Sequence, residues 1–447
     1  MTSQPPAPRP PAPQPPPAPP TPIRVAQLDL AGPDGEVLSF GPALPPAAAI
    51  DSGDDVYALV RVGGRPVATV VCTVPAGKNP ADAVAAHARA ELARTGIPVP
   101  SPATGTPPRT SVVVATRERA DRLAHALDSL LAQDHPDFEI VVVDNAPVTT
   151  ATEELVTQEY ADRAVPVRYV TEPVPGLAIA HNRGVAAADG EIVAFTDDDV
   201  IADPRWLTEL TRPFADDPGL GCTTGLILPA RLGTPAQILL ESHGGFAKGF
   251  AARTYDPALP PADEPLFPFT AGSFGSGANM AFRAAALRAA GGFDPATGTG
   301  TPARGGDDLY AFVAVLTAGY RLRYSPEALV WHHHRETWGD LTNQAYGYGA
   351  GLTAYLTAVL VRRPALLPSL LRKLPRGLAR ARTITAHRDS GGAAVPGAHG
   401  THDYPWPRQL SRLERRGMLA GPLGYAKARR QVRGVRPPWE PRGEEQP

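Results

Sequence analysis

The sequence predicts an α/β protein, with a mostly parallel sheet flanked by helices, a small β-rich unit before it and a helical, basic region after it. Between residues 110 and 196, short apolar runs alternate with segments of helical spacing, as in repeated strand–helix units. Two β-branched runs joined by Gly63 and Gly64 predict a hairpin nearer the N-terminus. From Arg362 to Arg433 the chain carries 16 Lys and Arg against 3 Asp and Glu, so this region differs from the acidic body before it.

Composition divides the 447 residues into five ranges. Of the first 22 residues 12 are Pro, so residues 1–22 are expected to form a disordered, polyproline-like tail. A small accessory domain with the hairpin and a helix is expected over 23–96, and a linker rich in Pro, Ser and Thr over 97–109. The main α/β domain occupies 110–350. The remainder, 351–447, is expected to be helical and basic, and partly disordered.

Cysteine content and hydropathy limit the cellular compartments in which the protein is expected. The chain has only Cys72 and Cys222, which excludes a disulfide framework and favours a reducing compartment. Met1–Pro22 lacks the apolar stretch of a secretory signal. The longest uncharged apolar run near the C-terminus, 350–361, is shorter than the roughly 20 residues that span a bilayer. We therefore expect a cytoplasmic protein, in solution or on the inner face of the membrane.

The elements of the main domain are expected in a regular order. Strands are expected at 111–116, 138–144, 165–170 and 191–196, and helices at 121–133, 152–162 and 177–188. Ligands of such sheets bind at the carboxyl ends of the strands. Polar residues follow three of the strands: Thr116, Arg117 and Glu118; Asp144; and Asp197, Asp198 and Asp199. The sequence thus predicts that these three groups converge on one edge of the sheet.

The triplet Asp197, Asp198 and Asp199 suggests a metal site. Adjacent carboxylates after a buried strand repel one another, and a divalent cation relieves that repulsion. Oxygen ligands favour Mg²⁺ or Mn²⁺, which keep open positions for the phosphate oxygens of a substrate. In the alternative reading, one Asp caps the helix that begins near Pro204 and the others are solvated.

Two further clusters carry titratable groups. Asp307 and Asp308 begin a helix after two glycines, so they serve either the helix dipole or general-base chemistry. In the run from His332 to His334, at most two side chains can point the same way along a strand, and we expect one metal ligand among them. No G-x-G-x-x-G follows the first strand of the sheet, which disfavours a dinucleotide-binding or P-loop enzyme.

The order of these motifs resembles the family 2 glycosyltransferases of the GT-A fold. SVVVATRERADRLAHALDSLLAQDHPDFEIVVVDNA, PVPGLAIAHNRGVAAADGEIVAFTDDDV, GSGANMAFR, GGFD and GGDD carry the resemblance, which covers roughly residues 110–350. It implies an inverting, metal-dependent transfer of a hexose from a UDP- or dTDP-sugar to an acceptor hydroxyl. The implied acceptor is a glycan or a lipid-linked molecule of cell-envelope polysaccharide or glycolipid synthesis.

The resemblance also implies a role for each candidate residue. Thr116, Arg117, Glu118, Asp144, Arg183, Asp197 and Asp198 would bind the nucleotide-sugar, with Asp144 at the base. Asp197, Asp199 and His332 would hold Mg²⁺ or Mn²⁺, and Asp308 would be the general base beside Asp307. The chain departs from the family in having Asp307 where Glu is usual.

Several alternatives stay open from the sequence. The sheet would also suit a sugar-phosphate nucleotidyltransferase, or a non-catalytic binding or scaffold protein that kept the fold. The basic C-terminal region suits an anionic membrane surface, and a helix packed on the catalytic domain is the competing reading. Nucleic acid is not expected as a partner, because few aromatic residues are interleaved with the basic ones. The sequence does not fix the oligomeric state.

Overall fold

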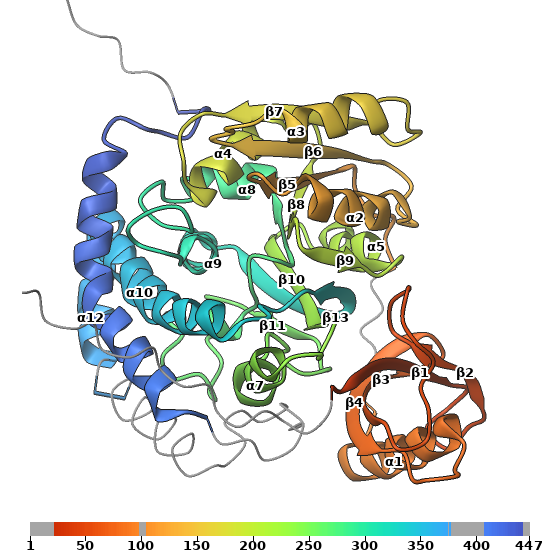
Figure 1. The fold of residues 1–447 in the computed structure, drawn as a ribbon. Helices are drawn as coiled ribbons and strands as arrows, with labels where there is room; N and C mark the ends of the chain where they lie inside the picture. Colours follow the sequence, from red (N-terminus) through yellow and green to blue (C-terminus); the bar gives the residue numbers. More distant parts are fainter. Residues whose placement is uncertain (1–21, 98–103, 374, 377–405, 441–447) are drawn as a thin grey trace, which may run out of the picture.

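The computed structural model describes residues 22–97, 104–373, 375–376 and 406–440 (Figure 1). The expected Pro-rich tail, except Pro22, lies outside the described residues, and so does the basic stretch 377–405. Two sheets are present in the described part of the chain. A four-stranded sheet belongs to the N-terminal unit and a nine-stranded sheet to the main body.

The N-terminal unit is a four-stranded sheet in the order β2-β1-β3-β4, with one helix on it. Its elements are β1 (Arg24–Leu30), β2 (Val37–Pro42), β3 (Asp55–Val62), β4 (Arg65–Thr73) and α1 (Pro80–Thr95). The expected hairpin is confirmed: β3 and β4 pair antiparallel, and Gly63 and Gly64 have φ of 57° and 79°, as a two-residue turn of this kind requires. The Asn79 side chain caps α1 by accepting hydrogen bonds from backbone N–H groups.

Strand β3 is buried on both faces, which explains its continuous apolar sequence. Val56, Ala58 and Val60 pack toward α1, in the core of the N-terminal unit. Leu59, on the opposite face, shares a cluster with side chains of the main body, among them Trp331. The N-terminal unit therefore packs against the main body through one face of β3.

The main body has the expected α/β architecture, a large sheet flanked by helices. The strand order is β11-β13-β10-β12-β8-β5-β6-β7, with β9 paired to β13. The first four strands of this sheet in the chain are β5 (Thr110–Thr116), β6 (Phe138–Asn145), β7 (Val167–Glu172) and β8 (Ile192–Asp197). They pair in parallel, whereas β12 pairs antiparallel to both β8 and β10. These four strands form the parallel block that the sequence pattern identified, and β10 and β13 form a further parallel pair in the other half of the sheet.

The helices between these strands are close to the expected ranges. They are α2 (Ala120–Leu131), α3 (Ala151–Glu154) and α4 (Leu177–Ala187). The expected helix 152–162 is shorter, because α3 passes into a π-helical turn, η1 (Leu155–Glu159). Alternate residues of β5 and β6 enter the cores on the two faces of the sheet, so both faces are buried.

The second half of the main body is less regular. Its strands are β9 (Val200–Ala202), β10 (Leu220–Pro229), β11 (Arg253–Tyr255), β12 (Met280–Arg283) and β13 (Arg321–His332). Its helices are α5 (Trp206–Thr211), α6 (Pro213–Asp216), α7 (Pro235–Gly244), η2 (Ala271–Ser273), α8 (Ala284–Ala289) and α9 (Asp307–Thr317). The long strand β13 joins this half together, because it pairs with β9, β10 and β11.

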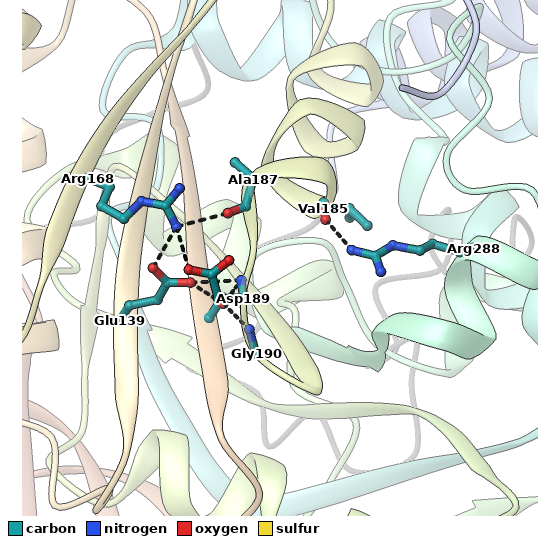
Figure 2. A network of polar contacts seen from close by, with 8 residues as sticks. Glu139, Arg168, Val185, Ala187, Asp189, Gly190 and Arg288 are labelled. Atoms are coloured by element: carbon teal, nitrogen blue, oxygen red, sulfur yellow. Dashed lines mark hydrogen bonds and ion pairs between the residues drawn. The ribbon is translucent and has the colours of Figure 1, made fainter. Parts of the chain in front are cut away.

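A polar network fixes the parallel strands at the end where they begin (Figure 2). The Arg168 guanidinium donates to Glu139 Oε2 at 2.8 Å, to the Ala187 carbonyl at 2.9 Å and to Asp189 Oδ2 at 3.2 Å. The other Glu139 oxygen accepts from the Ser111 hydroxyl and the Asp189 backbone N–H. Because these contacts join β5, β6, β7 and the turn after α4, they hold the strands whose opposite ends carry the candidate site.

Two C-terminal helices lie side by side along one flank of the main body, α10 (Trp338–Arg362) and α12 (Arg408–Gln431) (Figure 1). Glycines allow their close approach: a Cβ on Gly349 would lie 1.9 Å from the Glu414 carbonyl oxygen. The buried Asp294 carboxylate ties both helices to the core, through Arg362 Nε at 3.0 Å and the Tyr425 hydroxyl at 2.9 Å. Helix α10 runs through residue 350, where we expected the main domain to end.

Among the described helices, no single one is long and apolar enough to cross a bilayer. Together, α10 and the following helical segment Pro364–Lys373, which meet at 110°, have the length and composition of a broken span. Part of α10 packs inward, since Ala354, Tyr355, Ala358 and Val359 belong to the core of the main body. The apolar run that the sequence placed at 350–361 therefore contributes core residues in this structure.

Candidate active site

The carboxyl ends of β5, β6 and β8 bring the candidate residues to one edge of the sheet. Thr116 ends β5 beside Asp144 of β6, and Ala115 pairs with Asp197 of β8. The Thr116 hydroxyl donates to Asp198 Oδ2 at 2.7 Å, which links the end of β5 directly to the acidic triplet. The expected convergence of the three groups is confirmed by this geometry.

The three aspartates of the triplet face different neighbours. Asp198 is buried and accepts from Thr116 and from Arg119 Nη1, the latter at 3.1 Å. Asp197 and Asp199 instead face the position of His332, the last residue of β13, whose Nε2 lies 3.5 Å from Asp199 Oδ1. Burial and the charges of neighbouring carboxylates, Asp199 first, raise the pKa of Asp197 well above its ordinary value.

Asp197, Asp199 and His332 fit a divalent cation. Each offers one ligand atom, and the three atoms lie within 4.8 Å of one another. Two carboxylate oxygens and one imidazole nitrogen suit Mn²⁺ or Mg²⁺ and leave coordination positions open. Burial lowers the pKa of His332 to about 3, so its imidazole is neutral and has a lone pair for a metal.

Three arginines that sequence reasoning did not select surround Asp199. Nη1 of Arg119, Arg122 and Arg335 lies 3.6, 3.7 and 3.7 Å from Asp199 Oδ2, respectively. Their side chains are 36–50% exposed, so the guanidinium groups remain accessible to an anion. Arg119 and Arg122 belong to the segment RERADR, which directly follows the first strand. Because that strand ends at the acidic edge, the sequence could have indicated that these two arginines lie near it.

The second acidic pair lies at the start of α9. Asp308 Oδ2 accepts from the Gly277 backbone N–H at 2.9 Å, and Oδ1 accepts from the Leu309 N–H at 2.8 Å. Burial, followed by the charge of Asp307, raises the pKa of Asp308 to about 6. The charges of Asp307 and Asp308 in turn contribute to the raised pKa of Asp197, so the pair and the triplet share one electrostatic environment.

His181 is a further residue near the site that the sequence did not indicate. Its Nδ1 lies 3.4 Å from Asp307 Oδ2, and its ring packs against Phe195 and Phe293. The only sequence signal was its position on α4, four residues after the helix begins. Asp307 thus lies close to His181, and its charge also acts on Asp308.

The remaining expected residues differ in their surroundings. Asp144 is buried and accepts from the Tyr169 hydroxyl at 3.1 Å, and its Oδ1 has no hydrogen-bond partner in the described part of the chain. Glu118 accepts from the backbone N–H groups of Val148 and Thr149, which ties together the loops after β5 and β6. Arg117 and Arg183 are exposed.

The histidine run alternates as expected for a strand. His332 and His334 lie on the same side, with 3.1 Å between their Nδ1 atoms. His333 does not belong to the group of side chains that could hold a metal ion in the described structure. One residue of the three, His332, thus reaches the two aspartates.

The fold and this acidic edge place the main body in a known class. Residues 111–288 match the family described as Glycosyl transferase family 2, and they form a glycosyltransferase domain of that family. The match contains the parallel strands and the acidic triplet. It favours glycosyl transfer over the nucleotidyltransferase and scaffold alternatives.

Curated relatives share this domain. A pre-mycofactocin glycosyltransferase of Mycobacterium tuberculosis is 28% identical over 305 residues, which cover 65% of this chain and 59% of that protein. A glucosyl-dolichyl phosphate glucuronosyltransferase of Haloferax volcanii is 28% identical over 125 residues, 27% of this chain and 39% of that protein. The chain thus spans less than two thirds of the length of these relatives.

Solved structures with a similar chain path include two glycosyltransferases. Mannosyltransferase PcManGT from Pyrobaculum calidifontis, in complex with GDP-Man and Mn²⁺, has a TM-score of 0.47 and 20% identity, covering 72% of this chain and 90% of that chain. GalNAc-T7 with UDP, GalNAc and Mn²⁺ has a TM-score of 0.40 and 19% identity, covering 57% of this chain and 48% of that chain.

Proposed function

We propose that this protein transfers a hexose from a nucleotide-sugar to an acceptor hydroxyl, with inversion at the anomeric carbon and with a bound divalent cation. The observation that carries the proposal is that two sets of carboxylates with different surroundings lie close together. Asp197 and Asp199 lie with His332 in an arrangement that fits a metal, and Asp308 lies nearby with a raised pKa. Transfer from a diphosphate-linked sugar needs these two roles.

The donor would bind along the carboxyl ends of β5, β6 and β8. The unpartnered Oδ1 of Asp144 can accept a hydrogen bond from the N–H of a pyrimidine base, and we propose a UDP- or dTDP-sugar. Thr116, Arg117 and Glu118 would line the nucleotide, and Asp198 would keep the Thr116 hydroxyl in place. We assign the exposed Arg183 to the sugar-phosphate part of the donor.

The diphosphate would lie between the cation and the arginines. Asp197, Asp199 and His332 would hold Mn²⁺ or Mg²⁺, which supplies charge compensation for the departing nucleoside diphosphate. Arg119 and Arg335 have exposed guanidinium groups beside Asp199 that can contact phosphate oxygens.

Asp308 would act as the base in a single displacement. Its carboxylate takes the proton of the acceptor hydroxyl as that oxygen forms a bond to the anomeric carbon. The bond from the anomeric carbon to the phosphate oxygen breaks, and its electron pair leaves with the diphosphate. A pKa of about 6 leaves most of the Asp308 side chains ionised at neutral pH while keeping them more basic than an exposed Asp. Asp307, whose Oδ2 lies 3.4 Å from His181 Nδ1, would position the acceptor beside the base.

The acceptor that we propose is a glycan or a lipid-linked molecule of the cell envelope, met at the inner face of the membrane. The exposed side of α12 supports a membrane surface, because Leu419 and Leu423 are 84% and 61% exposed there. Arg416, three residues before Leu419, is also exposed. Lys427, four residues after Leu423, is exposed as well. Apolar side chains flanked by basic ones suit an anionic lipid surface.

Donor hydrolysis and sugar transfer, measured with Mn²⁺ and with EDTA, test the proposal. Asp199→Ala should abolish both reactions, as EDTA should in the wild type. The control is Asp162→Ala, which removes an exposed carboxylate just before β7, at the opposite end of the parallel strands. Full activity in EDTA would contradict the metal role, and a thermal-shift panel of nucleotide-sugars would identify the donor.

A further inference from the structure

A chain of buried polar side chains connects the N-terminal sheet to the proposed metal site. The Tyr57 hydroxyl, on β3, donates to Glu241 Oε1 at 3.2 Å. The second Glu241 oxygen, Oε2, lies 3.0 Å from His334 Nε2. His334 Nδ1 lies 3.1 Å from His332 Nδ1, and His332 Nε2 lies 3.5 Å from Asp199 Oδ1. The contacts are continuous from Tyr57 to the site.

We propose that Tyr57, Glu241 and His334 are positioning residues that hold His332 in the tautomer able to bind the metal through Nε2. This inference rests on the metal site of the proposed function. It adds a role for the N-terminal unit, which lies outside the matched glycosyltransferase domain and contributes Tyr57.

The tautomers follow from counting hydrogens. A hydrogen bond between two Nδ1 atoms needs one hydrogen, carried by either His332 or His334. The Glu241 carboxylate accepts from the Tyr57 hydroxyl and from His334 Nε2–H. A neutral His334 that carries its hydrogen on Nε2 has a lone pair on Nδ1, so it accepts from His332 Nδ1–H. His332 is then left with its lone pair on Nε2, the atom that faces Asp199.

The opposite direction of donation would defeat metal binding. If His334 donated from Nδ1, His332 would carry its hydrogen on Nε2 and point an N–H at the metal position. The 3.0 Å contact with Glu241 Oε2 opposes this arrangement, because it takes a donor on His334 Nε2, and an imidazole with one hydrogen then has none for Nδ1. The Glu241 carboxylate therefore determines, through His334, that His332 carries its hydrogen on Nδ1.

Burial makes these hydrogen bonds effective. The side chains of His334 and Glu241 are 0% and 9% exposed, so water competes little for their polar atoms. The Phe246 ring packs against both His332 and His334, with centroids 5.2 and 5.6 Å away. Burial, followed by the charge of Glu241, raises the pKa of Tyr57 well above its ordinary value, which keeps its hydroxyl protonated as a donor.

Tyr57 can reach Glu241 because of the register of β3. Tyr57, Leu59 and Arg61 share one face of the strand, and this face meets the main body. Leu59 packs with Trp331, next to His332, and the Arg61 guanidinium forms an ion pair with Asp203 at 2.6 Å. Docking of the N-terminal unit thus places the Tyr57 hydroxyl at the end of the chain of contacts.

The Mn²⁺ affinity of the full chain, measured by electron paramagnetic resonance without donor, tests the inference. Glu241→Ala should weaken Mn²⁺ binding by about 10- to 100-fold, the usual effect of losing a partner of a ligating His. Tyr57→Phe should weaken it less but in the same direction. The matched control is Arg65→Gln, which removes a 3.2 Å ion pair with Glu327 between the same two units and should leave the affinity unchanged.

The tautomers themselves can be read in the metal-free protein by ¹⁵N NMR of its histidine side chains. His332 should carry its hydrogen on Nδ1 and His334 on Nε2, and Glu241→Ala should disturb both signals. A purely structural role of Glu241 would lower stability without changing the tautomer of His332.

Each outcome decides the inference. Hydrogen on Nε2 of His332 in the wild type, or unchanged Mn²⁺ affinity in both Tyr57→Phe and Glu241→Ala, would overturn it. If Glu241→Ala does not fold, Tyr57→Phe alone decides by the same criterion. If the wild type binds no Mn²⁺ at all, the metal site of the proposed function fails and the inference fails with it, whereas normal wild-type binding with unaffected variants refutes only the inference.

Discussion

Replacing Asp308 by Asn should stabilise the fold at neutral pH while removing the proposed base. Burial and the charge of Asp307 raise the pKa of Asp308 from 3.8 to about 6. At about 1.36 kcal/mol per pH unit, keeping this carboxylate ionised costs the folded state up to about 3 kcal/mol, an upper limit because the side chain is half-buried. Asn can accept from only one of the Gly277 and Leu309 N–H groups, a loss of about 1 kcal/mol. The net gain should be about 1–2 kcal/mol.

The stability gain of Asp308→Asn should depend on pH, because it comes from a carboxyl group whose pKa is raised by folding. A carboxyl group whose pKa is raised by folding destabilises the native state above that pKa, and the destabilisation disappears as the pH falls toward 3.8. Urea unfolding of the metal-free protein should therefore show a full gain for Asp308→Asn near neutral pH and about a third of it near pH 5, where the charge term is halved and the lost hydrogen bond still costs about 1 kcal/mol.

A matched substitution should have the opposite effect. Asp294→Asn also removes a buried carboxylate, but one that pairs with Arg362 and Tyr425, so it should lower stability. Transfer by Asp308→Asn should fall by on the order of 10² to 10⁴ while nucleotide binding persists. An Asp308→Asn variant that is less stable than the wild type near neutral pH, or a gain that does not shrink in acid, would refute the reasoning.

Three further predictions concern the pH profile, the helix crossing and the membrane. The value of kcat/KM should fall about tenfold per pH unit below about pH 6, and Asp307→Asn should move this acid limb to lower pH, since it removes a charge that raises the pKa of the proposed base. Gly349→Ala should cost about 1–3 kcal/mol in thermal unfolding because its Cβ would meet the α12 backbone, whereas Gly339→Ala, with its nearest atom 3.8 Å away, should cost nothing. The protein should co-sediment with anionic but not neutral vesicles, less so at high salt, and replacing Leu419 and Leu423 by Ser should release it; a wild type that stays in the supernatant at low salt would contradict the membrane surface.

The parallel half of the sheet could be predicted because its signals are local. Each strand there is a short β-branched run with polar residues at its end, and the rule that parallel strands end at one edge brings Thr116, Asp144 and Asp197 together. The hairpin at Gly63 and Gly64 could also be predicted from the sequence, since the two positive φ angles of its turn favour glycine. The strands β1 and β2 carry weaker patterns, and their pairing depends on contacts distant in sequence.

Several residues near the site that the sequence did not indicate come from segments that are distant in the chain. His334 and Glu241 are 93 residues apart in the chain, and Tyr57 and Glu241 are 184 apart. No local spacing connects such residues, because their approach follows from the docking of β3 on the main body. His181 was hidden for a similar reason: on α4 it looks like one polar residue among small apolar ones, and only the packing of Phe293 and Asp307 around it reveals its place.

The direct test of the central claim is the anomalous diffraction of crystals grown with Mn²⁺ and a nucleoside diphosphate. The account predicts a manganese peak between the carboxylates of Asp197 and Asp199 and Nε2 of His332, with phosphate oxygens on the remaining coordination positions. A manganese peak elsewhere, or a diphosphate bound at the ends of β5, β6 and β8 with no metal beside these residues, would contradict it.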